Sequence, residues 1–316
     1  MPGSRWYARP VTVRSRLALA VAAGLGAMLL YAGQFVLSRW SIQRSVTLWD
    51  LAALRFGAAG LLLLPVVLRH GLASAAGVGW GRSVMLTITA GGPYTLILFA
   101  GLSLAPAGHG AVIIPGATPV VSTLLVWWWF GERASPGRLA GLVLVATGLV
   151  LVSWPGLAGG VGERTWLGDL LFVVAGILWG FFTVLARRWQ VDPLRATAMM
   201  WTLAAAAYLP VYLVVAGARL LAAPRREVVF QAVYQGVGVA IVALALYSWA
   251  IRVLGASFAS LFMPLIPVMG MLLAVPVLGE IPTPLQLVGV LAVSGGMALA
   301  AAGRPPGATA PMAGRG

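Results

Sequence analysis

The chain has 316 residues, of which 60% are hydrophobic and only 9% are charged, and its mean hydropathy is +0.96. A soluble domain carries about a quarter charged residues, so this composition excludes a water-soluble globule of this size. The formal net charge is +14 and all 21 basic residues are arginine. They lie singly or in pairs between apolar stretches, which excludes a nucleic-acid-binding surface and is typical of membrane-protein loops.

Ten segments are long and apolar enough to cross a bilayer core, which takes about 20 helical residues. The uncharged stretch 83–131 is too long for one helix, and we divide it at Pro106 and Gly108. We therefore expect an all-α membrane protein with ten transmembrane helices, over 17–37, 46–68, 83–104, 108–130, 138–155, 167–186, 196–217, 229–251, 255–278 and 284–303.

The arginine distribution predicts the orientation, because cytoplasmic loops carry an excess of basic residues. With the N-terminus inside, the inner segments hold 14 arginines and the outer loops 6, and Arg55 lies within the second helix. We expect the cell inner (plasma) membrane, with both termini cytoplasmic. The composition of 1–16 and 304–316 predicts disordered tails.

An internal repeat appears when the sequence is shifted by 148 residues. Residues 115–154 share 12 identities with 263–302, and the first helix matches the sixth at the same offset, Arg39 falling on Arg187. Each half, 17–155 and 167–303, then holds five helices, and 156–166 is the linker. Five is odd, so the second half enters the membrane upside down relative to the first. Inverted repeats are typical of secondary transporters, with the substrate at the repeat interface near the midplane.

The two halves share the pattern Pro-x(11)-Gly-Glu-x(3)-Pro followed by a glycine-rich helix, at Pro119 to Pro136 and at Pro267 to Pro284. This pattern, with the run 52–56 (AALRF), resembles the EamA family of the drug/metabolite transporter superfamily. The resemblance implies a ten-helix basket that exports or exchanges small metabolites such as amino acids. The chain departs from the family at His109, where a small residue is usual, and at Leu203, which stands where a second Arg55 would fall.

Three charged residues are candidates for structural roles. Glu132 and Glu280 follow the fourth and ninth helices, where each could cap the next helix, lie solvated at the interface, or couple an ion. Arg55 lies inside its helix and needs a partner or a water-filled cavity. Asp50 and Glu280 are on the same outer side as possible partners; binding an anionic substrate group and snorkelling to the interface are the alternatives.

The inward faces of helices one, three, four, six, eight and nine should line a substrate pocket, and six polar and aromatic residues on these helices are the candidates. For each of them, packing is the alternative role; His109 could be a neutral packed imidazole, a donor, or a titrating group. The six residues are Gln34, Tyr94, His109, Trp179, Gln235 and Tyr247.

We predict a secondary transporter, an exporter or exchanger that works by alternating access, with prolines bending helices four and nine. Its partners are a small-molecule substrate and the lipid bilayer. Asp50, Asp169, Glu132 and Glu280 all fall near span ends, which leaves ion coupling open.

An integral-membrane enzyme or receptor on the same scaffold is the alternative, but the sequence has no HExxH, GxSxG or P-loop motif. With two histidines and no cysteine, we expect no metal and no cofactor. The GxxxG spacings at Gly137 and Gly176 permit a homodimer without requiring one.

A reporter enzyme that is active only in the periplasm, fused after Gly316, should stay silent because the arginine bias places the C-terminus in the cytoplasm. Reporter activity in whole cells measures this directly. Periplasmic activity at that fusion point would contradict the orientation.

Overall fold

The computed structural model describes residues 13–159, 162–216 and 219–303. Ten helical spans in these ranges are long and apolar enough to cross a membrane. The first seven are α1 (Val13–Ile42), α2 (Leu48–His70), α3 (Trp80–Ala90) with α4 (Gly92–Leu104), α5 (Ala107–Phe130), α6 (Pro136–Leu157), α7 (Thr165–Trp189) and α8 (Pro193–Ala216). A short α9 (Arg219–Ala222) follows. The last three are α10 (Arg225–Gln231) with the π-helix η1 (Ala232–Ala243) and α11 (Leu244–Leu254), α12 (Ala256–Ala259) with the 3-10 turn η2 (Ser260–Phe262) and α13 (Leu265–Leu278), and α14 (Pro284–Ala302).

The ten predicted spans are confirmed, with ends that differ by a few residues. The largest difference is at α1, which begins at Val13 and ends at Ile42, so residues 13–16 are helical rather than part of a tail. The other predicted tail residues, 1–12 and 304–316, and residues 160–161 of the linker lie outside the described residues.

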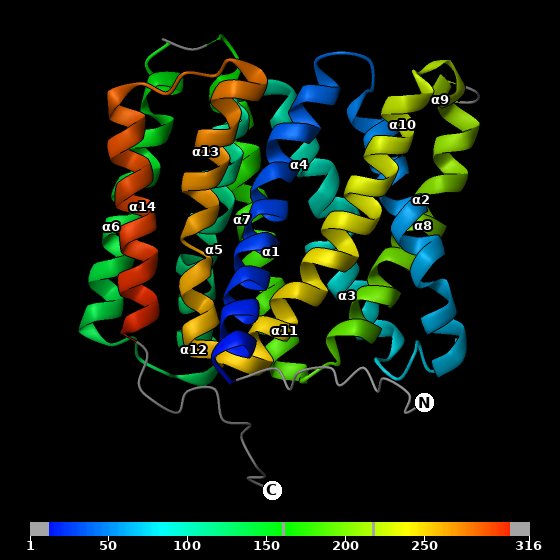
Figure 1. The fold of residues 1–316 in the computed structure, drawn as a ribbon, viewed down its shortest axis with the longest axis horizontal. Coiled ribbons are helices and arrows are strands. Elements are labelled where there is room, and N and C mark those ends of the chain that lie inside the picture. Colours follow the sequence, from blue (N-terminus) through cyan, green and yellow to red (C-terminus); the bar gives the residue numbers. More distant parts are fainter. Residues whose placement is uncertain (1–12, 160–161, 217–218, 304–316) are drawn as a thin grey trace, which may run out of the picture.

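The two ends of the helical bundle can be named from the chain. α1 begins and α14 ends at the lower side of Figure 1, which we call the terminal face, and the opposite side is the distal face. Ten crossings bring both chain ends to one face. The arginine distribution predicts that the terminal face is the cytoplasmic one.

The two repeats interlock about a two-fold axis. α6 and α14, the last helices of the two repeats, pack through glycines: Gly141 lies against the backbone of Gly296, and Gly148 against that of Gly289. The 148-residue shift relates Gly141 to Gly289 and Gly148 to Gly296. The contact between Gly141 and Gly296 is therefore the symmetry equivalent of the contact between Gly289 and Gly148. α1 packs against α13, and their counterparts α7 and α5 pack together in the same way. The predicted inverted repeat is thus confirmed in the packing.

The shared Gly-Glu-x(3)-Pro pattern is a helix–helix junction. Gly131 and Gly279 end α5 and α13 in the left-handed conformation, with φ of 67° and 70°, which favours glycine. Ser135 and Thr283 then cap α6 and α14, whose first residue is a proline in each repeat. Proline suits that position because its missing N–H would be unpaired there. The pattern therefore fixes one turn geometry at opposite faces of the membrane.

Three spans are irregular. The third breaks at Gly91 between α3 and α4, the eighth contains η1, and the ninth is interrupted at residues 260–264. The prediction of a bent helix is confirmed for helix nine. The fourth helix is not broken, since α5 runs unbroken through Pro115 and Pro119. π-Helices are rare, and they are frequent at functional sites.

Three of the four GxxxG glycines pack within the chain, and Gly137 has no heavy atom within 4 Å of the position that a Cβ would take. Gly176 and Gly180 hold α7 against Ala117 and Val121 of α5, and Gly141 belongs to the α6–α14 contact. A helix face already used in this way gives no support to a homodimer.

Replacing Gly148 by Ala should lower the melting temperature of the purified protein. The added methyl would lie 2.6 Å from the Gly289 carbonyl oxygen, and overpacking of this kind costs about 1–3 kcal/mol. Gly137→Ala on the same helix is the matched control, because no heavy atom lies within 4 Å of its added methyl. Alanine is the better helix former there, so this variant should be as stable as the parent or more stable. Equal shifts for both variants would contradict the packing.

Candidate functional site

Arg55 lies in the interior of the bundle, where α2 faces α1, α4 and α8. Its side chain is 4% exposed, which excludes a lipid-facing or snorkelling position. One terminal nitrogen, Nη1, donates a hydrogen bond to Gln34 Oε1 at 3.1 Å. The guanidinium carbon lies 5.0 Å from the centroid of the Trp201 ring and 5.9 Å from that of Phe99. A neutral amide and two aromatic rings therefore hold a buried cation.

The predicted carboxylate partners of Arg55 are engaged elsewhere. Asp50 accepts bonds from the Thr47 backbone and hydroxyl, which cap α2, and from the Tyr212 hydroxyl at 2.5 Å. The expectation of an ion pair with Asp50 or Glu280 was therefore wrong. In the described part of the chain Arg55 takes part in no ion pair, and its buried Nε has no hydrogen-bond acceptor.

Four of the six predicted pocket residues gather around this cation. Gln34 accepts a hydrogen bond from Arg55, and Tyr94 is close enough to interact electrostatically with the guanidinium. The centroid of the Tyr94 ring lies 5.0 Å from that of the Trp179 ring. Tyr31, the repeat equivalent of Trp179, lies in range of both Arg55 and Tyr247. The structure thus brings together residues of α1, α2, α4, α7 and α11.

Gln235 lies beside this cluster on η1. Its amide nitrogen donates to Ser38 Oγ at 2.8 Å, and Ser38 lies one helical turn after Gln34 on α1. The amide oxygen Oε1 of Gln235 is buried and has no hydrogen-bond partner in the described residues. Sequence reasoning missed the π-helix that places Gln235 there. The sequence carries no signal for it, because π-helical geometry depends on the packing of η1 against α1 and α2.

His109 lies elsewhere, near the distal end of α5. Its Nδ1 lies 2.8 Å from Asp169 Oδ1 on α7, and its Nε2 lies 2.7 Å from Gln286 Nε2 on α14. Gln286 Oε1 accepts the Thr283 backbone N–H, so the amide nitrogen must be the group that faces the imidazole. An amide nitrogen can only donate, so Nε2 of His109 is the acceptor and Nδ1–H donates to Asp169. His109 is therefore a neutral imidazole that links three helices.

Asp169 is a functional candidate that sequence reasoning missed. It lies near a span end, as expected, but it is only 5% exposed and its second oxygen, Oδ2, is buried without a partner among the described residues. Its repeat counterpart is Val21, so no repeated pattern could have pointed to it. The interior therefore does contain a buried carboxyl group.

Glu280 joins the two repeats at the distal face. Arg39 Nε, on α1, donates to Glu280 Oε1, and Arg39 Nη1 donates to the carbonyl oxygens of Leu102 and Ala105, both at 2.6 Å. Glu280 Oε2 accepts the Ala107 backbone N–H at 2.8 Å. The cation thus lies at the C-terminus of α4 and the anion at the N-terminus of α5, which suits both helix dipoles.

The predicted capping role of the two glutamates needs correction. Glu280 caps α5, which belongs to the other repeat, and the helix that follows it is capped by Thr283. The helix after Glu132 is likewise capped by Ser135. A hydroxyl at the capping position satisfies the following helix and leaves each glutamate free to bond elsewhere.

Glu132 forms the counterpart of this ion pair at the terminal face. The 148-residue shift turns Arg39 into Arg187 and relates Glu132 to Glu280, and Arg187 Nη2 lies 3.9 Å from Glu132 Oε1. The distal side chains are 15% and 17% exposed, whereas the terminal ones are 54% and 47% exposed. The distal pair is therefore in hydrogen-bond contact and shielded from solvent. The equivalent terminal pair is 3.9 Å apart and exposed to solvent, and we call it the loose pair.

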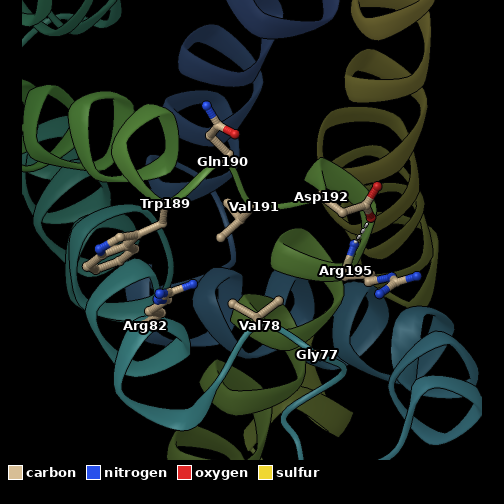
Figure 2. A pocket seen from close by; sticks show the side chains of 8 residues that line it. All are labelled: Gly77, Val78, Arg82, Trp189, Gln190, Val191, Asp192 and Arg195. Carbon is tan, nitrogen blue, oxygen red and sulfur yellow. Dashed lines mark hydrogen bonds between the residues drawn. The ribbon is translucent and has the colours of Figure 1, made fainter. Parts of the chain in front are cut away.

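A pocket of about 250 Å³ opens where α7 ends and α8 begins (Figure 2). Arg82 lies against the Trp189 ring in it, and Asp192 accepts the backbone N–H of Arg195. The lining is formed by Gly77, Val78, Arg82, Trp189, Gln190, Val191, Asp192 and Arg195. None of the six predicted pocket residues lines it. It marks the terminal face as hollowed next to the end of α7.

Comparison with known proteins agrees with this architecture. The sequence profile of the EamA-like transporter family matches residues 18–154 and 166–302, one match in each repeat. A solved structure titled "Crystal structure of protein" superposes with a TM-score of 0.58 at 22% identity and covers 90% of this chain and 97% of that one, which shows a shared fold.

Three curated relatives are similar in sequence. The uncharacterized inner membrane transporter YedA of Escherichia coli is 26% identical over 73% of this chain and 74% of its own length. An uncharacterized transporter of Archaeoglobus fulgidus is 28% identical over 51% of this chain, and the uncharacterized protein PA1977 of Pseudomonas aeruginosa is 31% identical over 54%. The chain spans 55% and 57% of the lengths of the latter two relatives.

Nitrogen NMR of histidine-labelled protein should show His109 as the Nδ1-protonated neutral tautomer, because Gln286 occupies Nε2 as a donor. His70, the other histidine, is exposed and serves as the internal reference. Gln286→Leu, which removes the donor, should relax the tautomer preference. An Nε2-protonated His109 in the parent protein would contradict the hydrogen-bond assignment.

Proposed function

Because the chain belongs to the EamA-like transporter family, we propose that it is a secondary transporter that works by alternating access between its two inverted repeats. Its substrates are small metabolites, which it exports or exchanges across the inner membrane with both chain ends in the cytoplasm. Support for this location comes from the arginine distribution and from the inner-membrane relative in Escherichia coli.

The observation that carries the proposal is the unequal state of the two equivalent ion pairs. In an inverted-repeat transporter the second conformation arises when the two repeats exchange their roles. Exchange would close Arg187 onto Glu132 and release Arg39 from Glu280. The present conformation then has its distal gate shut and its terminal gate loosened.

The hydrogen bonds at the distal face stabilise the conformation in which that face is closed. Hydrogen bonds to charged groups contribute about 1.5–3 kcal/mol each, and Glu280 makes two that join the repeats, one with Arg39 and one with the Ala107 N–H. The loose pair at the terminal face is solvated, and exposed pairs contribute about 0–1 kcal/mol. A substrate that binds between the repeats has to offset only the difference between two such gates, because one closes as the other opens.

Removing either glutamate should slow transport. Proteoliposomes loaded with a ¹³C-labelled bacterial metabolite extract, with efflux followed by mass spectrometry, identify the cargo from the compounds that leave the vesicles. Glu280→Gln removes the anion of the distal gate and Glu132→Gln that of the terminal gate. Each should lower the efflux of the transported compounds roughly tenfold, since each weakens one obligatory closed state by about one charged hydrogen bond.

Glu163→Gln, an exposed change between α6 and α7, is the matched control and should leave efflux unchanged. The double exchange Arg39→Glu with Glu280→Arg should not recover the lost efflux, because it places a carboxylate against the Leu102 and Ala105 carbonyl oxygens and an arginine against the Ala107 N–H. If no compound leaves faster than from protein-free vesicles, the transporter proposal is wrong. If the glutamate variants transport at the parental rate, the gates are wrong.

A further inference from the structure

Arg55 is a buried cation without a buried anion. Placing an arginine inside a bilayer costs at least about 2.5 kcal/mol on insertion scales. The usual compensation is a carboxylate, yet both acids on this side are used by other groups. Cation–π contacts with Trp201 and Phe99 and one bond to Gln34 satisfy only part of a guanidinium that carries five N–H donors.

The elements around Arg55 carry further unsatisfied polar atoms. Thr95 Oγ1 on α4 and Gln235 Oε1 on η1 are buried without hydrogen-bond partners among the described residues, as is Arg55 Nε itself. α2 contacts both α4 and η1, and α1 contacts the same two elements. Buried polar groups in native proteins are paired with protein, water or ligand. Unpaired groups on these adjoining elements mark the place where another molecule supplies the missing partners.

Some aromatic residues of this cluster have aromatic counterparts in the other repeat, whereas Arg55 has no charged counterpart. Tyr31 is equivalent to Trp179, and Phe99 to Tyr247, so these rings are contributed by both repeats. The counterpart of Arg55 is Leu203. One interface between repeats therefore offers rings on two sides and a positive charge on one side only.

We propose that Arg55 is the substrate-binding residue of this transporter and that its substrate is a small organic monoanion, a carboxylate attached to a flat apolar group. The carboxylate takes the free N–H groups of Arg55, and the apolar group lies against the aromatic rings that the two repeats contribute, with Tyr94 from the first and Trp179 from the second. This substrate class rests on the proposed transport function.

The charge distribution excludes two other substrate classes. A cationic substrate would meet the Arg55 charge, and in the described residues no free carboxylate faces the cluster to offset it, because Asp50 is bonded to Thr47 and Tyr212. A dianion such as a phosphate monoester would need a second cation. The other arginines within the described spans lie near helix ends, at the two faces of the bundle.

The test compares three ligands that differ in one group: 3-phenylpropanoate, the neutral 3-phenylpropanamide and the cationic 3-phenylpropylammonium. Binding is followed by thermal stabilisation and calorimetry of the purified full-length protein. The carboxylate should bind about tenfold or more tightly than the amide, because charge-assisted bonds are about twice as strong as neutral ones. Arg55→Met should abolish this preference, and Arg44→Met in the distal loop should not.

Gln34→Glu is a second variant that keeps Arg55, so the proposal can still be tested if the Arg55→Met protein does not fold. It places a carboxylate where Nη1 already donates, so it should raise the melting temperature without ligand and abolish the preference for 3-phenylpropanoate. Failure of the carboxylate to bind better than the amide in the parent protein, including failure of both to bind, would overturn the proposal. A lowered melting temperature of Gln34→Glu would overturn it as well. Efflux that still depends on Glu280 and Glu132 would, in that case, leave the transport function standing and reject only the substrate class.

Discussion

The bonds that Arg39 and Glu280 make at the distal face are the contact on which the rest of the structure depends. They tie the first helix of one repeat to the turn after α13 of the other, and they cap the helices on both sides of the break at Pro106. A helix that ends near the membrane surface leaves its last carbonyl groups without partners within the helix, and a helix that begins there leaves its first N–H groups without partners. Both kinds of group need other partners when they are buried. Arg39 lies in the same repeat as Leu102 and Ala105, whereas Glu280 supplies the partner of the Ala107 N–H only while the repeats stay together. Opening the face would therefore expose the N-terminus of α5 as well as two charges.

Symmetry and its violation have different roles in this molecule. The junctions, the glycine contacts and the gates all come in equivalent pairs, which allows two conformations of similar free energy. Arg55 and the hydrogen-bonded group of His109, Asp169 and Gln286 have no counterparts, since Leu203, Ser257, Val21 and Arg138 stand at the equivalent positions. Under the proposed function, substrate recognition falls to residues without a repeat counterpart, because one substrate needs a particular chemistry only once.

The sequence predicts the fold well because hydropathy and the constant 148-residue offset both follow from the chain alone. It also points to Gln34 and Tyr94, which are buried, because polar groups inside apolar spans need hydrogen-bond partners that lipid does not supply. Their part in substrate binding stays a prediction. The sequence misplaces His109 and the partner of Arg55, because a position near a span end does not tell whether the bundle buries it. Asp169 lies near a span end and is still buried, because α7 packs along α4 and α5. The π-helix depends on packing that the chain pattern does not encode.

Pulsed electron–electron double resonance in lipid tests the central claim, that the two faces open reciprocally. Spin labels at Gln43 and Ile281 report on the distal face, and their repeat equivalents Val191 and Arg133 report on the terminal face. In the parent protein the distal distance should be short with a narrow distribution and the terminal distance longer. Glu280→Gln should lengthen the distal distance and shorten the terminal one in the same sample. Distances that change together, or a distal distance that stays fixed when Glu280 is replaced, would contradict alternating access through these two ion pairs.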